Sequence, residues 1–140
     1  MKILIDTNVV LDILLQRQPW YANASLIFSF AQQNYIESYI SASAITDIFY
    51  IAQKDIGKSN ARAAIKILLQ VFRPATVTDS HIYQALESGW DDFEDSVQFI
   101  VGKELSVDYI VTRNTQDFFS GNIPAVTPEQ FVQLNADIER

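Results

Sequence analysis

Four aspartates stand where an apolar segment would be expected to continue or to end in a neutral residue. They are Asp6, Asp47, Asp95 and Asp117. Asp6 ends the first apolar run of the chain, and Asp47 interrupts the nearly all-apolar residues 44–52. A buried carboxylate is costly unless it is paired, hydrogen-bonded or bound to a metal. If the four meet in space they need a divalent cation, and such a site predicts metal-assisted attack on a phosphodiester or phosphate ester.

Each aspartate also has a plainer interpretation. Asp6 could cap the helix that follows it, and Asp117 could be a loop or cap residue. Asp95 could belong to the acidic enrichment that is usual in the first turn of a helix. We expect Asp47 to lie away from the surface, because a charge within an apolar helix is rarely exposed. Its alternative role is a pair with a buried arginine or tyrosine.

Other polar residues near these aspartates could complete a site. Asp92 lies three residues before Asp95, so both side chains can point to one side of a helix. Thr112 and Asn114 could hydrogen-bond the carboxylates or a water molecule. Two residues of the segment after Asp6 could support the site or face solvent, and these are Asn8 and Asp12. We favour a supporting role for Asn8.

A few basic residues are candidates for contact with a nucleic acid. Lys58, Arg62 and Lys66 recur at every fourth position. They form either a solvated helix face or a track for a phosphate backbone. Arg113 could meet a phosphate or pair with an acid. His81 is the one histidine. The sequence offers it no suitable serine or cysteine partner motif, so we expect a structural role.

Composition limits the class of protein. With 140 residues, of which 49% are hydrophobic, the chain is long enough for one domain spanning residues 1–140. It has no cysteine, which excludes disulfides and cysteine-ligated zinc. Acidic residues break the first apolar run too early for a signal peptide, and no stretch is long enough to span a membrane. We therefore expect a cytoplasmic protein. The net charge of −7 argues against nonspecific binding of nucleic acid through overall charge.

The order of the predicted elements indicates an α/β fold with a mainly parallel sheet flanked by helices. The expected strands are residues 2–5, 35–40, 75–77, 109–112 and 125–126. The expected helices are residues 9–15, 20–34, 41–55, 60–71, 79–88 and 92–105, with a last one starting at 127–130. Ligands of such sheets sit beyond the carboxyl ends of the strands. Asp6 and Asp117 both follow an apolar strand, so residues over a hundred positions apart can share a site.

The acidic motifs together resemble those of the PIN domain family. They are Asp6-Thr7-Asn8-Val9-Val10-Leu11-Asp12, Ser43-Ala44-Ile45-Thr46-Asp47, Asp92-Phe93-Glu94-Asp95 and Thr112-Arg113-Asn114-Thr115-Gln116-Asp117-Phe118. Their order and spacing match over nearly the whole chain, and the bacterial branch that includes VapC-type toxins is the most similar. The resemblance implies a PIN-like sandwich with a central parallel sheet.

The resemblance also implies a function. Members of that branch are Mg²⁺- or Mn²⁺-dependent endoribonucleases that cleave single-stranded RNA, are often homodimers, and are inhibited by a small antitoxin. By position, Asp6, Asp95 and Asp117 would be catalytic metal ligands, and Asp47 would occupy the second acidic position, where many members have Glu. Asp92 would be a possible extra ligand. Asn8, Thr112 and Asn114 would support the site, and Lys58, Arg62, Lys66 and Arg113 could contact RNA.

Two other functions remain open at this point. A non-catalytic interaction module with the same fold would explain the acidic composition and the Asp in place of Glu at position 47. A haloacid-dehalogenase-like phosphatase would use Asp6 as a nucleophile, but the second aspartate of its Asp-x-Asp start is Asn8 here.

Overall fold

A five-stranded sheet forms the centre of the computed structural model, which describes residues 1–118 and 121–136. The strands are β1 (Lys2–Ile5), β2 (Glu37–Ser41), β3 (Arg73–Ala75), β4 (Tyr109–Val111) and β5 (Ala125–Val126). Their order is β3-β2-β1-β4-β5, and every neighbouring pair is parallel. The predicted α/β fold is confirmed, with a sheet that is wholly parallel. The expected domain 1–140 includes residues 119–120 and 137–140, which lie outside the described part.

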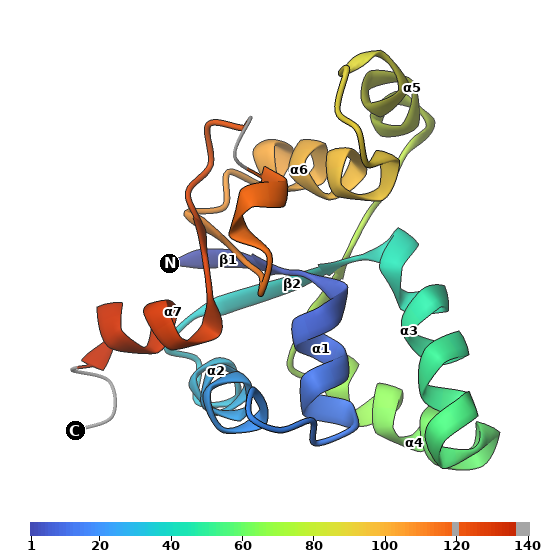
Figure 1. Ribbon diagram of the computed structural model, residues 1–140, viewed down its shortest axis with the longest axis vertical. Coiled ribbons are helices and arrows are strands. Elements are labelled where there is room, and N and C mark those ends of the chain that lie inside the picture. Colours follow the sequence, from blue (N-terminus) through green and yellow to red (C-terminus); the bar gives the residue numbers. More distant parts are fainter. Residues whose placement is uncertain (119–120, 137–140) are drawn as a thin grey trace.

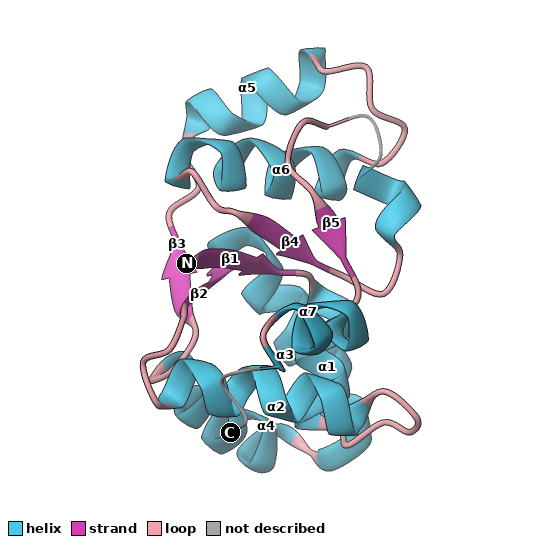
Figure 2. Ribbon diagram, turned by 90° about the vertical axis from the view of Figure 1, so that its left-hand side faces the viewer, coloured by secondary structure: helices cyan, strands magenta, loops and turns pink. Residues whose placement is uncertain are grey.

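Helices cover both faces of the sheet. They are α1 (Thr7–Leu14), α2 (Tyr21–Gln32), α3 (Ala42–Ile56), α4 (Lys58–Leu69), α5 (Asp79–Glu87), α6 (Phe93–Leu105) and α7 (Pro128–Leu134). Figure 2 shows α5 and α6 in one layer and α1–α4 with α7 in the other, with the sheet between them. This arrangement explains why the central strands are apolar on both sides.

The central strand β1 divides the core between the two layers. Ile3, Leu4 and Ile5 are all fully buried. Ile3 and Ile5 belong to the larger hydrophobic cluster, which includes residues of α1, α2, α3, α4 and α7. Leu4 belongs to the cluster on the other face, with Ile110 and Phe118. This division follows from the alternation of side chains along a strand.

Gly57 joins α3 to α4 without a spacer, which differs from the sequence prediction. The sequence predicts a left-handed cap at Gly57 and a helix of residues 60–71 capped by Ser59. Instead Gly57 has φ 85° and ψ 159°, and α4 begins at the next residue, Lys58. That backbone conformation is open almost only to glycine, so one residue both ends α3 and starts α4.

The start of α7 is as predicted, whereas the position of Phe93 is not. Thr127 and Gln130 form a reciprocal capping box with Pro128 at the first helical position. The helical spacing predicts that Phe93 faces inward, but its side chain is 45% exposed. It is the first residue of α6, and the buried face of that helix begins only at Ser96.

The two edges of the sheet are short. β3, at one edge, has three residues with Pro74 in the middle, and begins two residues earlier than the predicted strand at 75–77. β5, at the other edge, has two residues. No helix in the described part of the chain is long and apolar enough to cross a membrane.

Candidate active site

The candidate active site lies at the carboxyl edge of the sheet. α1 starts two residues after β1, α3 follows β2 directly, and a short 3-10 helix, η1 (Thr115–Phe118), comes after β4. Figure 1 shows α1 and α3 beginning beside the ends of β1 and β2, with α6 on the other side of these strand ends. Residues from the two ends of the chain can therefore meet here.

Asp6 is the best-anchored carboxylate of the site. It is 7% exposed and caps α1, where Oδ1 accepts a hydrogen bond from the backbone N of Thr7 at 2.8 Å. Gln98 Nε2 donates to Oδ1 at 3.0 Å, and Thr112 Oγ1 donates to Oδ2 at 2.8 Å. The capping interpretation is thus correct and compatible with a functional one, because the same carboxylate joins β1, α6 and the end of β4.

Asp95 is a carboxylate on which burial and several neighbouring charges act together. Partial burial and then the nearby carboxylates of Asp92, Asp6, Asp117 and Glu94 raise the pKa of Asp95 to about 7. A shift of this kind means that the acids around Asp95 lie close enough to disfavour its ionised form. Acidic side chains from separate segments of the sequence therefore lie near Asp95.

Glu94 is a further acid of the site, one that the sequence analysis did not select. The pKa of Glu94 is raised overall, and partial burial is the largest cause. A hydrogen bond from Thr7 Oγ1 at 3.2 Å opposes the rise, and the charges of Asp47, Asp6 and Asp92 add to it. Its place in the first turn of α6, beside Asp95, was the available signal. That signal is weak, because acidic residues are common in the first turn of any helix.

Asp47 is exposed, so the expectation that it lies away from the surface is wrong. The buried residues of α3 are Ala44, Ile48 and Ala52, one helical turn apart, and Asp47 lies off that stripe. The neighbours that suggested burial, Tyr50 and Ile51, are themselves exposed. Asp47 nevertheless lies close enough to the site for its charge to act on Glu94.

Asp92 and Asp117 occupy the margin of the site. Asp92 caps α6, and its Oδ1 accepts from the backbone N of Asp95 at 2.9 Å, a role that the sequence did not suggest. Asp117 lies in η1 and is exposed. Both carboxylates contribute to the raised pKa of Asp95, so both border the same small volume.

The donor set fits a hard divalent cation, although the acids do not close around a single point. Within residues 1–118 and 121–136, no three acidic or histidine side chains are close enough to ligate one ion. The acids offer only oxygen ligands, which Mg²⁺ and Mn²⁺ prefer. Partial burial and then the neighbouring carboxylates raise the pKa of Asp95, and the buried Oε1 of Gln98, beside Asp6, has no hydrogen-bond partner. A cation would relieve both.

Two of the three expected supporting residues act through their side chains. Thr112 Oγ1 donates to Asp6 and accepts from the backbone N of Asn114 at 3.0 Å. Asn8 Oδ1 accepts from the backbone N of Arg113 at 3.4 Å. Asn114 takes part through its backbone, and its side chain is exposed. The loop after β4 is therefore tied to Asp6 and to Asn8 in the first turn of α1.

The sequence pattern of the PIN domain family matches residues 2–116. The chain belongs to the PIN domain family. The pattern of that family thus extends through β1, α3, α6 and β4, the segments that carry or adjoin the acids described above.

Known PIN-domain proteins resemble the chain along most of its length. It is 24% identical over 137 residues to ribonuclease VapC1 of Aquifex aeolicus, covering 94% of each protein. VapC20 of Mycobacterium tuberculosis, described as a sarcin–ricin loop cleaving toxin, has a TM-score of 0.68 at 18% identity, covering 85% of this chain and 95% of that one. VapBC2 of Rickettsia felis, bound to a promoter DNA fragment, has a TM-score of 0.67 at 13% identity, covering 90% and 97%.

Arg113 of this PIN domain pairs with an acid. This is one of the two roles that the sequence suggested, the other being contact with a phosphate. Its Nε lies 3.0 Å from Oδ2 of Asp12, and its guanidinium stacks on Trp20 at 3.8 Å from the ring centroid. Asp12 is fully buried. Burial raises the pKa of Asp12, and the charges of Arg113 and Arg17 oppose that rise. Asp12 therefore supports the loop after β4 and does not face solvent.

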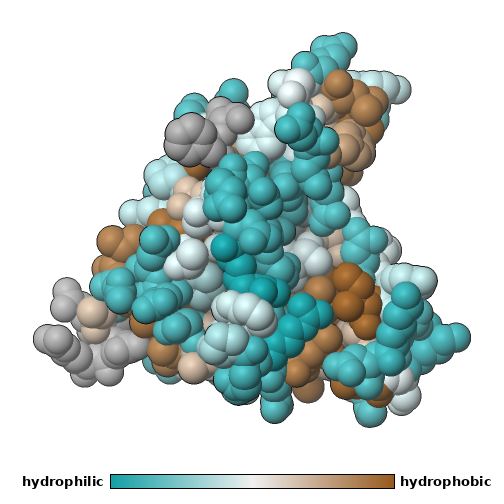
Figure 3. Space-filling view, viewed as in Figure 1, coloured by the Kyte–Doolittle hydropathy of each residue, from teal (hydrophilic) through white to brown (hydrophobic). Residues whose placement is uncertain are grey.

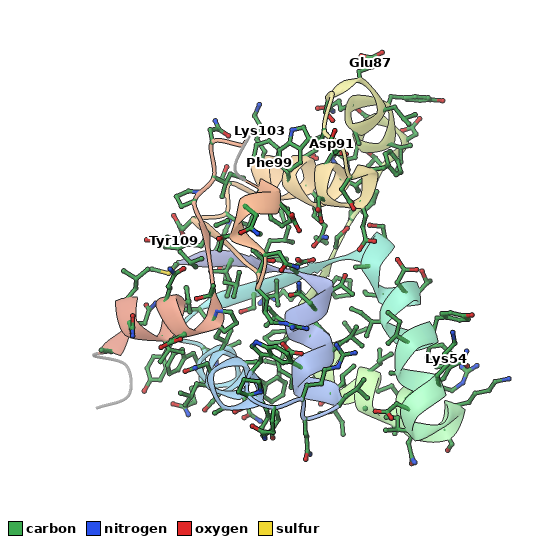
Figure 4. All side chains as sticks on the ribbon, viewed as in Figure 1. Lys54, Glu87, Asp91, Phe99, Lys103 and Tyr109 are labelled. Atoms are coloured by element: carbon green, nitrogen blue, oxygen red, sulfur yellow. The ribbon has the colours of Figure 1, made fainter. Side chains whose placement is uncertain are left out.

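The other basic candidates lie on α4, next to a groove between α3 and α4. The groove, of about 630 Å³, is lined by Ile45, Thr46, Phe49, Arg62, Ala63 and Lys66 among others. The Arg62 guanidinium lies 5.4 Å from the centroid of the Phe49 ring. Figure 3 shows hydrophobic residues reaching the surface between α1 and α3, bordered by hydrophilic ones. Lys54 projects from the far part of α3, away from the sheet (Figure 4).

His81 has the structural role expected for it. Its Nδ1 accepts from the backbone N of Thr78 at 2.9 Å, in a capping box that starts α5, and its Nε2 contacts Glu104 of α6. Because Nδ1 accepts, the ring proton is on Nε2 and points at the Glu104 carboxylate. The histidine is buried and lies outside the acidic site.

Gln98 and Thr7 are site residues that sequence reasoning missed. Gln98 is fully buried and donates to Asp6, and Thr7 donates to Glu94. An amide three residues after Asp95, in an otherwise apolar stretch, was a usable signal. Thr7 carried none, because a threonine after a helix cap is common.

Proposed function

We propose that this chain is a metal-dependent endoribonuclease that cleaves single-stranded RNA, and that it is the cytoplasmic toxin of a toxin–antitoxin pair. The observation that carries the proposal is the grouping of acids around two neighbouring residues of α6. Asp6 and Asp117 act on Asp95, whose pKa is raised to about 7, and Asp6 and Asp47 act on Glu94. The similarity to ribonuclease VapC1 and VapC20 supports the same chemistry. In this proposal residues 1–140 form a single PIN domain.

The residues that would hold Mg²⁺ or Mn²⁺ are Asp6, Asp47, Asp95 and Asp117, with Asp92 as a possible extra ligand. When bound, the ion supplies activation of the attacking water and positive charge for the phosphoryl oxygens. Thr112 and Gln98 fix the two oxygens of Asp6 so that this carboxylate keeps one orientation. Thr7 holds Glu94 beside the site, where it can accept a proton as the water is deprotonated.

The RNA would approach over the basic residues of α4. Lys58, Arg62 and Lys66 lie on the helix that packs against α3, which carries Asp47. Three cations near an acidic site would attract the phosphate backbone locally, although the chain as a whole is strongly acidic. Arg113 contributes less in this respect, because Asp12 already neutralises it.

A small antitoxin would bind in the groove between α3 and α4. The groove combines apolar walls, such as Ile45 and Phe49, with the cations Arg62 and Lys66, and thus suits an amphipathic segment with acidic residues. Thr46 lies on the groove wall directly before Asp47, so a bound segment would cover the edge of the acidic site. The solved structure of VapBC2 from Rickettsia felis supports such a pairing, and a homodimer of this chain is part of the same proposal.

Cleavage of single-stranded RNA by the purified chain tests the proposal. We expect cleavage with Mn²⁺ or Mg²⁺ and none with excess chelator. Asp6→Asn keeps an oxygen that can cap α1 but removes the charge, so it should lower the rate at least a hundredfold. Asp55→Asn, the same change at an exposed position near the end of α3, is the matched control and should leave the rate unchanged. Cleavage that persists in chelator, or in Asp6→Asn, would refute the mechanism.

A non-catalytic interaction module is the alternative that one observation favours. Among the described residues no three acids lie close enough together to ligate an ion, and the second acidic position holds the short Asp47. Titration calorimetry with Mn²⁺ separates the two functions. Micromolar binding that is lost in Asp95→Asn supports the nuclease, and absence of binding supports the module.

A further inference from the structure

A pocket of about 310 Å³ opens next to the loop that follows β4. Three segments form its walls: the start of α2, the loop after β4, and the start of α7. The lining residues include Trp20, Asn23, Arg113, Thr127, Pro128 and Glu129. Helices α2 and α7 pack side by side in the layer below the sheet (Figure 1). The pocket is separate from the acidic site and from the groove between α3 and α4.

Trp20 gives this pocket an aromatic wall. The indole is 40% exposed, although tryptophan is usually largely buried. The Arg113 guanidinium stacks on it at 3.8 Å from the ring centroid. Aromatic faces and guanidinium planes are the surfaces on which proteins stack unpaired nucleobases.

An ion pair with the buried Asp12 holds Arg113 in place. Asp12, fully buried, lies 3.0 Å from Arg113 Nε, and Arg17 lies 3.9 Å from the other carboxylate oxygen. Two cations and one anion meet here, and Glu129 at the pocket wall brings the formal sum to zero. In a chain of net charge −7, this is a neutral region that a polyanion can approach.

The pocket is mechanically linked to the acidic site. Arg113 follows Thr112, which donates to Asp6 at 2.8 Å, and the backbone N of Arg113 donates to Asn8 Oδ1 at 3.4 Å. The pocket therefore lies at the same edge of the sheet as Asp6, since Arg113 follows β4 closely and Thr127 follows the neighbouring parallel strand β5.

We propose that this pocket binds one base of the RNA strand, flanking the cleaved linkage, by stacking on Trp20. The Asn23 amide and the Glu129 carboxylate provide a donor and acceptors for the edge of the base, and Glu129 favours bases with an exocyclic amino group. This subsite rests on the proposed function and adds to it a selection of the base beside the cut.

Intrinsic fluorescence can report on Trp20 directly. The chain has two tryptophans, and Trp90 packs on Phe99 at a centroid distance of 4.9 Å. In Trp90→Phe only Trp20 emits. We expect a single-stranded RNA, added in chelator to prevent cleavage, to quench that emission, and an abasic strand with the same backbone to leave it unchanged.

Affinity measurements with labelled RNA complete the test. Trp20→Leu should weaken RNA binding about tenfold, since base–aromatic stacking has that order of effect. Trp20→Phe should retain most of the affinity, and Trp90→Phe should bind RNA as tightly as the unmodified chain. The abasic strand should bind all of these proteins with the same affinity. Trp20→Phe and the fluorescence signal keep the test valid even if Trp20→Leu does not fold.

The outcomes separate the subsite from the proposed function. If RNA binds and is cleaved while Trp20 emission and the affinity of Trp20→Leu are unchanged, the subsite is wrong and the nuclease stands. If RNA quenches Trp20 but no divalent ion permits cleavage, a base does stack on Trp20, but the nuclease is wrong and with it the selection of a base beside a cut. If the chain binds no RNA, both are wrong.

Discussion

At the residue scale, Asp6 shows how one carboxylate can serve both fold and function. It caps α1 and accepts from Gln98 and Thr112, residues 92 and 106 positions away in the sequence. The cost of burying this acid is met by those donors, and they also hold it in one orientation. Its partners are therefore as important for the proposed chemistry as the carboxylate itself.

Replacing Thr112 tests this dependence. Its hydroxyl donates to Asp6 and accepts from the backbone N of Asn114. Thr112→Val leaves the buried Asp6 Oδ2 without this donor and the Asn114 N without its acceptor. It should lower the free energy of unfolding by about 1–3 kcal/mol, with a loss of RNA cleavage. Thr112→Ser keeps the hydroxyl and should retain both, as measured by urea denaturation and by the cleavage rate. If Thr112→Val and Thr112→Ser had the same stability and the same cleavage rate, the Thr112 hydroxyl would not have this role.

The raised pKa of Asp95 predicts a pH dependence of stability in the absence of metal. The folded pKa, about 7, exceeds the ordinary value of 3.8 for an aspartate, so the folded chain holds this proton more tightly than the unfolded one. The contribution of Asp95 is therefore fully present below pH 3.8 and is lost as the pH rises through about 7. Asp95→Asn removes this loss. The melting temperature of Asp95→Asn minus that of the original chain should therefore increase as the pH rises from 3.8 to about 7.

Melting curves in chelator measure this difference, with Asp55→Asn as the control, whose difference from the original chain should not change with pH. Added Mn²⁺ should stabilise the original chain more than Asp95→Asn, because ligands stabilise the state that binds them. A pH-independent difference for Asp95→Asn would contradict the convergence of charges at this residue.

The acids of the site could be found from the sequence, but their exposure and their partners could not. Asp6 and Asp95 stood out because they follow or precede apolar segments. Asp47 stood out for the wrong reason, since its apolar neighbours Tyr50 and Ile51 are on the surface. The pair of Asp12 with Arg113 depends on how the loop after β4 lies against α1, a tertiary contact without a local signal.

At the element scale, the ends of helices place the functional groups. Asp6 and Asp92 cap α1 and α6, and both helices start at the acidic edge. The capping box of α7 was readable from Thr127-Pro128-Glu129-Gln130, because it depends on local spacing. The start of α4 at Lys58 was not, because the unusual conformation of Gly57 removed the expected loop.

His81 belongs to this scale, since it caps α5 and ties that helix to α6. His81→Ala removes the acceptor for the Thr78 backbone N and should lower the free energy of unfolding by about 1 kcal/mol, while the cleavage rate per folded molecule stays the same. His81→Gln supplies the usual capping-box partner and should recover part of the loss. A cleavage rate that falls in both variants would assign His81 a role in the chemistry.

At the scale of the whole molecule, the proposed function requires that a strongly acidic chain bind RNA through few local contacts. Three cations of α4 are the proposed contacts. The logarithm of the RNA affinity should then fall with the logarithm of salt concentration with a slope of about −2, from about −0.7 per phosphate contact. Lys66→Gln should reduce the slope by about 0.7. Binding titrations at several KCl concentrations measure it, and a slope unchanged by Lys66→Gln would contradict this track.

The margins of the sheet also constrain how copies of the chain can meet. An unprotected outer strand presents free N–H and C=O groups to which a strand of another molecule can add. Here Pro74 removes an N–H from the middle of β3, and β5 offers only two residues. Lateral growth of the sheet into a continuous intermolecular ribbon is thereby disfavoured, so the homodimer that we propose would be built from helical surfaces.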